Sequence, residues 1–186
     1  MKKLKKFVVA IAVFGCASSA SVWAQSGVPS ALQGWYISPS LNVIDVDSSF
    51  NAGSTGEGLG LRAGKAVAPN WDVQIGTTYA RARDNGNSYY QNTLGVDGLY
   101  MFSRERLRPF VLIGAGASYD RANQPSKEVS GTSGYINAGV GLQYSFTDRV
   151  SLQADVRRVH TFLRDDDFGT SRSRNNYLNV GVNYAF

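Results

Sequence analysis

The stretch INAGVGLQYSFTDRVSLQADVRRVH, residues 136–160, decides the fold. Its first half places Ile136, Ala138 and Val140 at every second position, with small or polar residues between them. After a short link, Val150–His160 repeats the alternation. Side chains along a β-strand point alternately to the two faces of the sheet. Two such stretches joined by a short turn therefore predict an antiparallel hairpin with one apolar and one polar face.

The same period of two recurs along the rest of the chain. The expected strands are Trp35–Ile44, Gly58–Val67, Trp71–Ala82, Tyr90–Phe102, Pro109–Tyr119, Ile136–Phe146, Val150–His160 and Tyr177–Phe186. Short links at Ala68–Asn70, Ser103–Arg108 and Thr147–Arg149 alternate with mostly longer, polar ones at Asp45–Glu57, Asp84–Tyr89, Asp120–Gly134 and Leu163–Asn176. Strands of about 9–13 residues match tilted strands that cross a bilayer. We predict an all-β, eight-stranded antiparallel up-and-down transmembrane β-barrel.

The face that meets lipid decides the class of barrel. The interior of an eight-stranded barrel is just wide enough for side chains, which favours the face rich in Gly, Ser and Asn as its lining. Aromatic residues gather at strand ends and predict two girdles at the membrane–water interfaces. The expected girdle residues are Trp35, Trp71, Tyr100, Phe102, Phe110, Tyr144, Phe146, Tyr184 and Phe186 at the short-turn end, and Tyr79, Tyr89, Tyr90, Tyr119, Tyr135 and Tyr177 at the long-loop end.

The first 24 residues read as a cleaved signal peptide. A lysine-rich start precedes a short apolar run, and small residues lead to Ala24. Without the four lysines of this segment, 15 of the 19 Lys and Arg remain against 14 Asp and Glu, so the net charge of +5 does not indicate a nucleic-acid partner. Cys16, the only cysteine, would leave with the signal. Lipidation of Cys16 is the alternative, but Phe14 fits a lipobox poorly.

Residues 25–33 are expected to form a periplasmic N-terminal tail, and residues 34–186 the barrel domain.

The chain resembles the eight-stranded outer-membrane barrels of Gram-negative bacteria, of the outer membrane protein A and porin F N-terminal type. Gly139–Arg149, Val150–Arg157 and the closing Tyr184-Ala185-Phe186 carry this resemblance. It implies export to the outer membrane, and it marks Tyr184 and Phe186 as a signal to the barrel-assembly machinery. Many relatives carry a C-terminal peptidoglycan-binding domain; since this sequence ends at Phe186, cell-wall tethering is not implied.

Charged residues on the inward phase are few; the clearest are Arg62, Asp97, Asp155 and Arg157. The first three each lie five residues from the short-turn end of their strand, which is about 12–13 Å of height in a tilted strand. An unpaired charge at that depth is costly. We predict an Arg–Asp network that plugs the lumen and fixes strand register. A gate in a narrow conductive path is the alternative.

Two arginines fall on the lipid-facing phase near the outer ends of their strands. Arg81 and Arg158 lie where an arginine costs about 0–1 kcal/mol. Because guanidinium groups pair well with phosphate, both are candidates for contact with lipopolysaccharide. Snorkelling of these side chains toward water is the alternative.

His160 is the only histidine. The segment Arg157–Phe162 resembles that of lipid A 3-O-deacylases, but Phe162 stands where those enzymes carry a serine nucleophile. The adjacent Thr161 points to the opposite face. A histidine without a nucleophile has nothing to activate, so we expect no enzyme. The acidic run Asp165–Asp167 lacks the glycine-spaced pattern of a calcium loop, and no metal is expected.

These features predict a monomeric outer-membrane barrel with a structural or surface-interaction role: envelope integrity, lipopolysaccharide contact and recognition of an extracellular ligand through its loops. The expected partners are outer-membrane lipid, lipopolysaccharide and, transiently, the barrel-assembly machinery. We expect no cofactor and no nucleic acid. A narrow passive pore is the alternative function, and a lipid A-modifying enzyme is the third.

Overall fold

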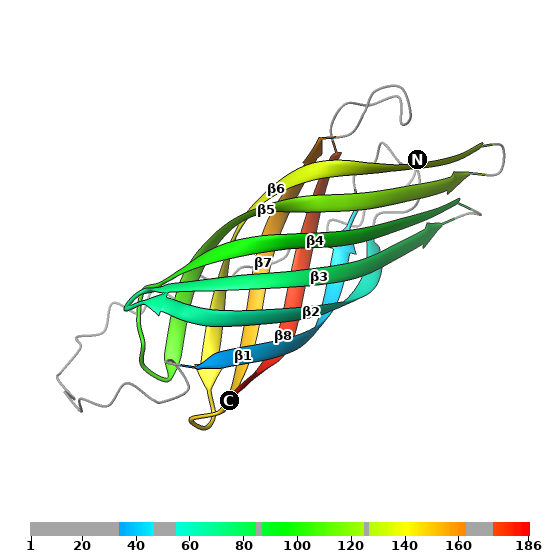
Figure 1. The fold of residues 1–186 in the computed structure, drawn as a ribbon. Helices are drawn as coiled ribbons and strands as arrows, with labels where there is room; N and C mark the ends of the chain where they lie inside the picture. Colours follow the sequence, from blue (N-terminus) through cyan, green and yellow to red (C-terminus); the bar gives the residue numbers. More distant parts are fainter. Residues whose placement is uncertain (1–33, 47–54, 85–86, 125–126, 163–172) are drawn as a thin grey trace, which may run out of the picture.

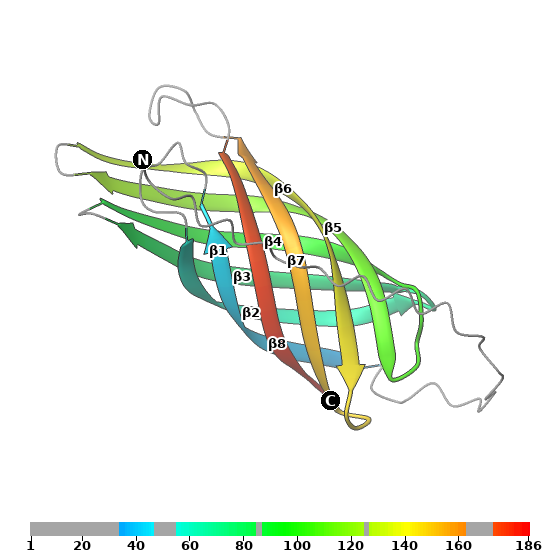
Figure 2. The same ribbon diagram turned by 180° about the vertical axis from the view of Figure 1, so that it is seen from behind.

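The computed structural model describes residues 34–46, 55–84, 87–124, 127–162 and 173–186. They form a closed antiparallel barrel in which each strand pairs with its sequence neighbours and β1 closes on β8. The strands are β1 (Trp35–Asp45), β2 (Thr55–Ala68), β3 (Trp71–Asp84), β4 (Asn87–Met101), β5 (Leu107–Gln124), β6 (Lys127–Ser145), β7 (Val150–Phe162) and β8 (Ser173–Ala185). Figures 1 and 2 show them tilted around one axis. The predicted fold class is confirmed.

Alternating burial shows which face is which. Most large apolar side chains point outward, as Leu41 does with 68% exposure, whereas most inward ones are small or polar, as Asn179 is with 1%. A buried apolar cluster of Leu99, Met101, Phe110 and Leu112 on β4 and β5 is an exception. No helix in the described part of the chain is long and apolar enough to cross a membrane. The predicted sidedness, with the apolar face outside, therefore holds along the strands.

Two predicted loops are largely strand. β3 pairs with β4 as far as Asp84 and Asn87, and β5 pairs with β6 as far as Gln124 and Lys127. The strands accordingly run from 11 residues in β1 to 19 in β6. The sequence of these outer extensions is rich in polar residues, so the alternation of apolar and polar residues that marks a strand fades although the pairing of the strands continues.

Four aromatic residues assigned to the girdles point into the barrel instead: Tyr89, Phe110, Tyr135 and Tyr177 are buried. Glycines make room for them. A Cβ atom on Gly95 would collide with the Tyr135 hydroxyl, and one on Gly141 with the Phe110 ring. The assignment of these four rings to the girdles was therefore wrong, because glycines on nearby strands leave room for large rings inside the barrel.

Candidate functional site

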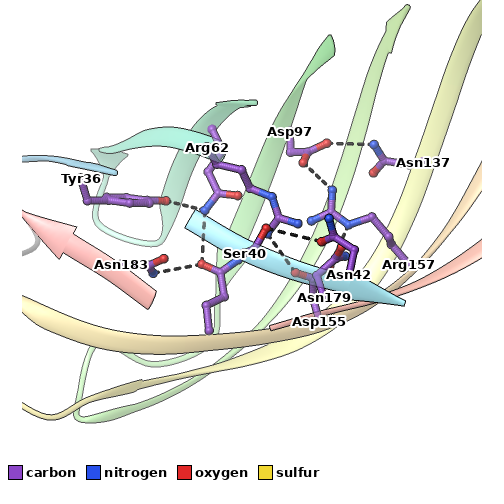
Figure 3. Close-up of polar contacts among 12 residues, drawn as sticks. Tyr36, Ser40, Asn42, Arg62, Asp97, Asn137, Asp155, Arg157, Asn179 and Asn183 are labelled. Carbon is purple, nitrogen blue, oxygen red and sulfur yellow. Dashed lines mark hydrogen bonds and ion pairs between the residues drawn. The ribbon is translucent and has the colours of Figure 1, made fainter. Parts of the chain in front are cut away.

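Four charged side chains from three strands meet inside the barrel. Arg62 lies on β2, Asp97 on β4, and Asp155 and Arg157 lie two positions apart on β7. All four are buried. Figure 3 shows their side chains converging. The structure therefore brings together the residues that the alternation of the sequence had placed on the inward face.

Arg157 joins the two carboxylates. Its Nε lies 2.7 Å from Oδ1 of Asp155, and its Nη1 lies 2.7 Å from Oδ2 of Asp97. Nη1 of Arg62 lies 3.2 Å from Oδ2 of Asp155. We call this run from Arg62 through Asp155 and Arg157 to Asp97 the central ion-pair chain. It contains two positive and two negative groups, so its formal charges cancel.

Two amides complete the central ion-pair chain. Nδ2 of Asn137 on β6 donates to Oδ1 of Asp97 at 2.9 Å, and Nδ2 of Asn179 on β8 donates to Oδ1 of Asp155 at 2.7 Å. A buried ion pair is stable only when its remaining lone pairs and protons are also hydrogen-bonded. These amides meet that need for the carboxylates, and they extend the network to strands on both sides of β7.

A row of neutral side chains lies on the short-turn side of the central ion-pair chain. Nε2 of Gln74 donates to the Tyr36 hydroxyl at 2.8 Å and to Oε1 of Gln153 at 3.3 Å. Nδ2 of Asn183 donates to the same Gln153 oxygen at 3.1 Å. Figure 3 shows this row beside the charged groups. The row therefore links β1, β3, β7 and β8 through side-chain hydrogen bonds inside the barrel.

Asp120 anchors a second cluster, at the outer end of the barrel, which the sequence analysis missed. The Tyr89 hydroxyl and Nε2 of Gln91, the latter at 2.6 Å, both donate to its Oδ1. The Ser118 hydroxyl donates to its Oδ2 at 2.7 Å. None of the ion pairs among the described residues involves Asp120. The sequence predicts that Asp120 begins a loop. Ser118, two residues earlier, faces inward, and if the strand continues Asp120 faces inward as well, which was the available signal in the sequence.

A fourth ion pair lies at the short-turn end. Nη1 of Arg104, in the turn between β4 and β5, lies 2.7 Å from Oδ1 of the buried Asp72. Arg104 also donates to the carbonyl oxygens of Pro69 at 2.6 Å and Ala68 at 3.2 Å. It therefore ties its own turn to the turn between β2 and β3. The sequence analysis assigned this segment to a short link and did not name the pair.

Side chains fill most of the lumen between these clusters. A cavity of about 30 Å³ lies on the outer side of the central ion-pair chain and is lined in part by Tyr135 and Tyr177. Another of about 20 Å³ lies at the short-turn end and is lined in part by Tyr36 and Arg108. Each has room for about one or two waters. The central ion-pair chain lies between the two cavities.

The two outward arginines lie on different sides of the barrel. Arg158 on β7 is exposed, and its Nε donates to Oδ1 of Asn176 on β8 at 2.9 Å. Nδ2 of Asn176 in turn donates to Oδ2 of Asp45 on β1 at 3.4 Å. These three residues also share one register row. Arg158 is therefore held at the outer end of the surface formed by β7, β8 and β1.

Arg81 lies on the surface formed by β3, β4 and β5. It is half-buried and pairs in register with Tyr90, which pairs with Arg121. Nη2 of Arg83 donates to the Tyr90 hydroxyl at 3.1 Å. Three arginines thus surround one tyrosine on this outward face.

The other candidate residues lie as follows. His160 faces outward and is half-buried, Thr161 points inward, and Phe162 is exposed. Tyr184 and Phe186 point outward at the short-turn end, and the Phe186 backbone N–H donates to the Trp35 carbonyl at 3.0 Å. The histidine and the nearest hydroxyl therefore lie on opposite faces of β7.

Several predictions concern residues outside the described ranges. These are the signal peptide at 1–24 with Cys16, the tail at 25–33, and Asp165–Asp167. Within the described ranges, no group of three His, Cys, Asp or Glu side chains could hold a metal ion.

The sequence matches the family model of the outer membrane protein beta-barrel domain over residues 8–186. It matches no curated protein.

Solved structures share the fold at low identity. Neisserial surface protein A matches with a TM-score of 0.70 at 18% identity, covering 83% of this chain and 98% of that one. The N-terminal β-barrel domain of OprF from Pseudomonas aeruginosa matches with a TM-score of 0.54 at 18% identity, covering 82% and 98%. The outer membrane enzyme PagL matches with a TM-score of 0.50 at 12% identity, covering 81% and 99%. At such identities the likeness concerns the fold alone.

Proposed function

The chain belongs to the outer membrane protein β-barrel family, and from this premise we propose that it is a structural barrel of the Gram-negative outer membrane with a closed lumen. Its role is to support envelope integrity, to contact lipopolysaccharide from its outer rim and to present its loops for recognition outside the cell. The barrel works as a monomer and reaches the membrane through the barrel-assembly machinery.

The central ion-pair chain is the observation that carries this proposal. Arg62, Asp155, Arg157 and Asp97 cross the interior with ion-pair distances of 2.7–3.2 Å. To open a path, an ion would have to separate buried opposite charges, which is costly in a poorly hydrated interior. A lumen filled in this way supports a structural role over transport.

Planar-bilayer recording of the refolded protein tests the closed lumen. We expect no steady channels, because the gaps on either side of the central ion-pair chain hold only about one or two waters each. Steady channels in the wild-type protein would instead assign the passive pore. If their conductance also rises when Arg157 and Asp97 are both replaced by alanine, the conducting path runs through the lumen. The paired replacement is informative because it removes the barrier without leaving one charge unpaired.

The lipopolysaccharide contact is supported by the arginines on the outer rim. Arg81 lies beside Tyr90 in register, with Arg83 and Arg121 nearby on the same outward face. Arg158 occupies a second position, on the surface of β7 and β8. Phosphate groups of the outer leaflet are the anions that arginine at this height would meet, and such pairs form strong, often bidentate hydrogen bonds.

Binding to bilayers that contain lipid A, with or without its phosphates, tests this contact. Arg81→Gln and Arg158→Gln together should weaken the preference for the phosphorylated lipid severalfold. Lys65→Gln is the matched control, because Lys65 is also a basic residue of the barrel wall but lies over Trp35 at the short-turn end. An equal loss in the control, or no loss in the double variant, would refute the contact.

Lipid A modification is the weaker candidate because His160 and Thr161 face opposite sides of β7. Mass spectrometry of lipid A from cells with and without the protein decides this. Loss of an acyl chain that depends on His160 would establish the enzyme.

A further inference from the structure

Arg108 has the least exposed side chain of the arginines in the described part of the chain, with 1% exposure. It is the second residue of β5, and its side chain points inward just inside the short-turn end of the barrel. The sequence analysis placed it in the link Ser103–Arg108, where an arginine would be solvated. Its burial therefore needs a partner that the sequence did not suggest.

The hydrogen bonds of Arg108 leave part of its guanidinium unused. Nε donates to the Glu105 carbonyl oxygen at 2.7 Å, but the buried Nη2 has no hydrogen-bond partner. Asp72 lines the same cavity, yet its carboxylate is engaged by Arg104 at 2.7 Å. Among the described residues, no carboxylate forms an ion pair with Arg108. One positive charge at this end thus lacks a matched negative one.

The cavity beside Arg108 offers further donors. It measures about 20 Å³ and is also lined by Tyr36, Ser151 and the exposed turn residues Thr147 and Arg149. The Tyr36 oxygen accepts from Gln74 at 2.8 Å, and the Ser151 oxygen accepts from Gln143 at 2.8 Å. Because each hydroxyl oxygen is used as an acceptor, its own hydrogen is left to donate. The site therefore offers three donors, from Arg108, Tyr36 and Ser151, beside two acceptors, the Asp72 carboxylate and the unpartnered Oδ1 of Asn183. It is open toward the short-turn face.

We propose that this cavity binds one small monovalent anion, a halide such as chloride, as the counterion of Arg108. The guanidinium Nη2 and the hydroxyls of Tyr36 and Ser151 hold it. A space of this volume takes one guest of about the size of a water and is too small for phosphate or sulfate. Asp72 opposes the anion, but Arg104 already balances its charge, and Arg149 adds a further positive group at the rim.

Crystals of the refolded mature barrel grown in bromide test the proposal. We expect one anomalous peak within contact distance of Nη2 of Arg108, and we expect it to vanish in Arg108→Gln. Arg106→Gln is the control, since it removes an equal charge from the exposed part of the same turn and should keep the peak. No peak in the wild type, or a peak that persists in Arg108→Gln, would overturn the proposal, and water would then be the occupant.

Halide titration in detergent gives an independent readout that needs no crystals. Line broadening of the chloride NMR signal should show saturable binding by the wild type, weakened at least tenfold in Arg108→Gln. If that variant does not fold, as judged by the mobility of unboiled samples, Ser151→Ala keeps the charge and removes one donor, and it should weaken binding severalfold. Unsaturable broadening in the wild type, or unchanged affinity in Ser151→Ala together with Tyr36→Phe, would contradict the site.

Discussion

Asp155 and Asp120 are both buried carboxylates inside the same barrel, yet they are held in different ways. Asp155 faces two guanidinium groups, from Arg62 at 3.2 Å and Arg157 at 2.7 Å. Among the described residues, Asp120, at the outer end, accepts only from neutral donors, such as Gln91 at 2.6 Å. The centre of the lumen is therefore balanced by charge, whereas the outer end is satisfied by hydrogen bonds without an opposite charge.

Both buried carboxylates have their lone pairs satisfied by hydrogen bonds, but only Asp155 also has an oppositely charged partner. In the centre, the arginines are also buried, so removing either an arginine or a carboxylate leaves the opposite charge buried without its ionic partner. At the outer end, the donors from Tyr89, Gln91 and Ser118 are neutral groups that cost less when left alone. Substitutions of the charged groups should therefore cost more in the centre than substitution of Asp120 at the outer end.

The largest effect is expected from Arg157→Met. This change leaves Asp97 with only the amide donor of Asn137, and it leaves Asp155 with the guanidinium of Arg62 and the amide of Asn179. Removing one partner of a buried ion pair costs about 3–5 kcal/mol. The free energy of unfolding, measured by urea titration of the barrel in lipid vesicles with tryptophan fluorescence, should fall by that amount.

The double variant Arg157→Met with Asp97→Asn is the control for this prediction. It removes both members of one pair, so it should recover a large part of the loss. A single variant as stable as the wild type would show that the central ion-pair chain does not hold the lumen together.

A matched pair of substitutions tests the two regions directly. Asp155→Asn breaks charged hydrogen bonds worth about 1.5–3 kcal/mol, whereas Asp120→Asn keeps an acceptor for neutral donors and should cost about 1 kcal/mol or less. Both are measured by the same urea titration. Equal losses would mean that charge balance does not distinguish the centre from the outer end.

The sequence could predict the centre because its evidence is local. Arg62, Asp97 and Asp155 lie in the middle of clearly alternating strands, at equal distance from short turns, so their face and height follow from counting. Arg108 and Asp120 lie just beyond the two ends of the predicted strand Pro109–Tyr119, where the alternation fades and a one-residue error moves a side chain to the other face. The inward turn of Tyr135 depends on Gly95 from another strand, which counting along one strand cannot reveal.

The loss of stability should differ less between substitutions of a neutral donor at the outer end and in the centre than between substitutions of the two carboxylates. Gln91→Leu removes a donor to Asp120 and an acceptor for the Tyr177 hydroxyl, so it should cost about 1–3 kcal/mol. Asn137→Leu removes one donor to Asp97, which still faces Arg157, and should cost about 1 kcal/mol. Thermal unfolding, followed by the gel mobility of unboiled samples, ranks the two. A greater loss for Asn137→Leu would reverse the assigned importance of neutral donors.

The smallest change in the free energy of unfolding is expected at Arg158, the sequence neighbour of Arg157, where the largest change is expected. Arg158 adjoins Arg157 in sequence but faces outward, where its Nε donates to Asn176 at 2.9 Å. In zwitterionic bilayers, Arg158→Gln should change the free energy of unfolding by no more than about 0.5 kcal/mol, as for other surface changes. Arg157 and Arg158 are the same type of residue at consecutive positions of β7, so a comparison of the two variants tests only which face of the strand each side chain occupies. If Arg158→Gln destabilised the barrel as much as Arg157→Met, the assignment of one face of β7 to the lumen and the other to lipid would be wrong.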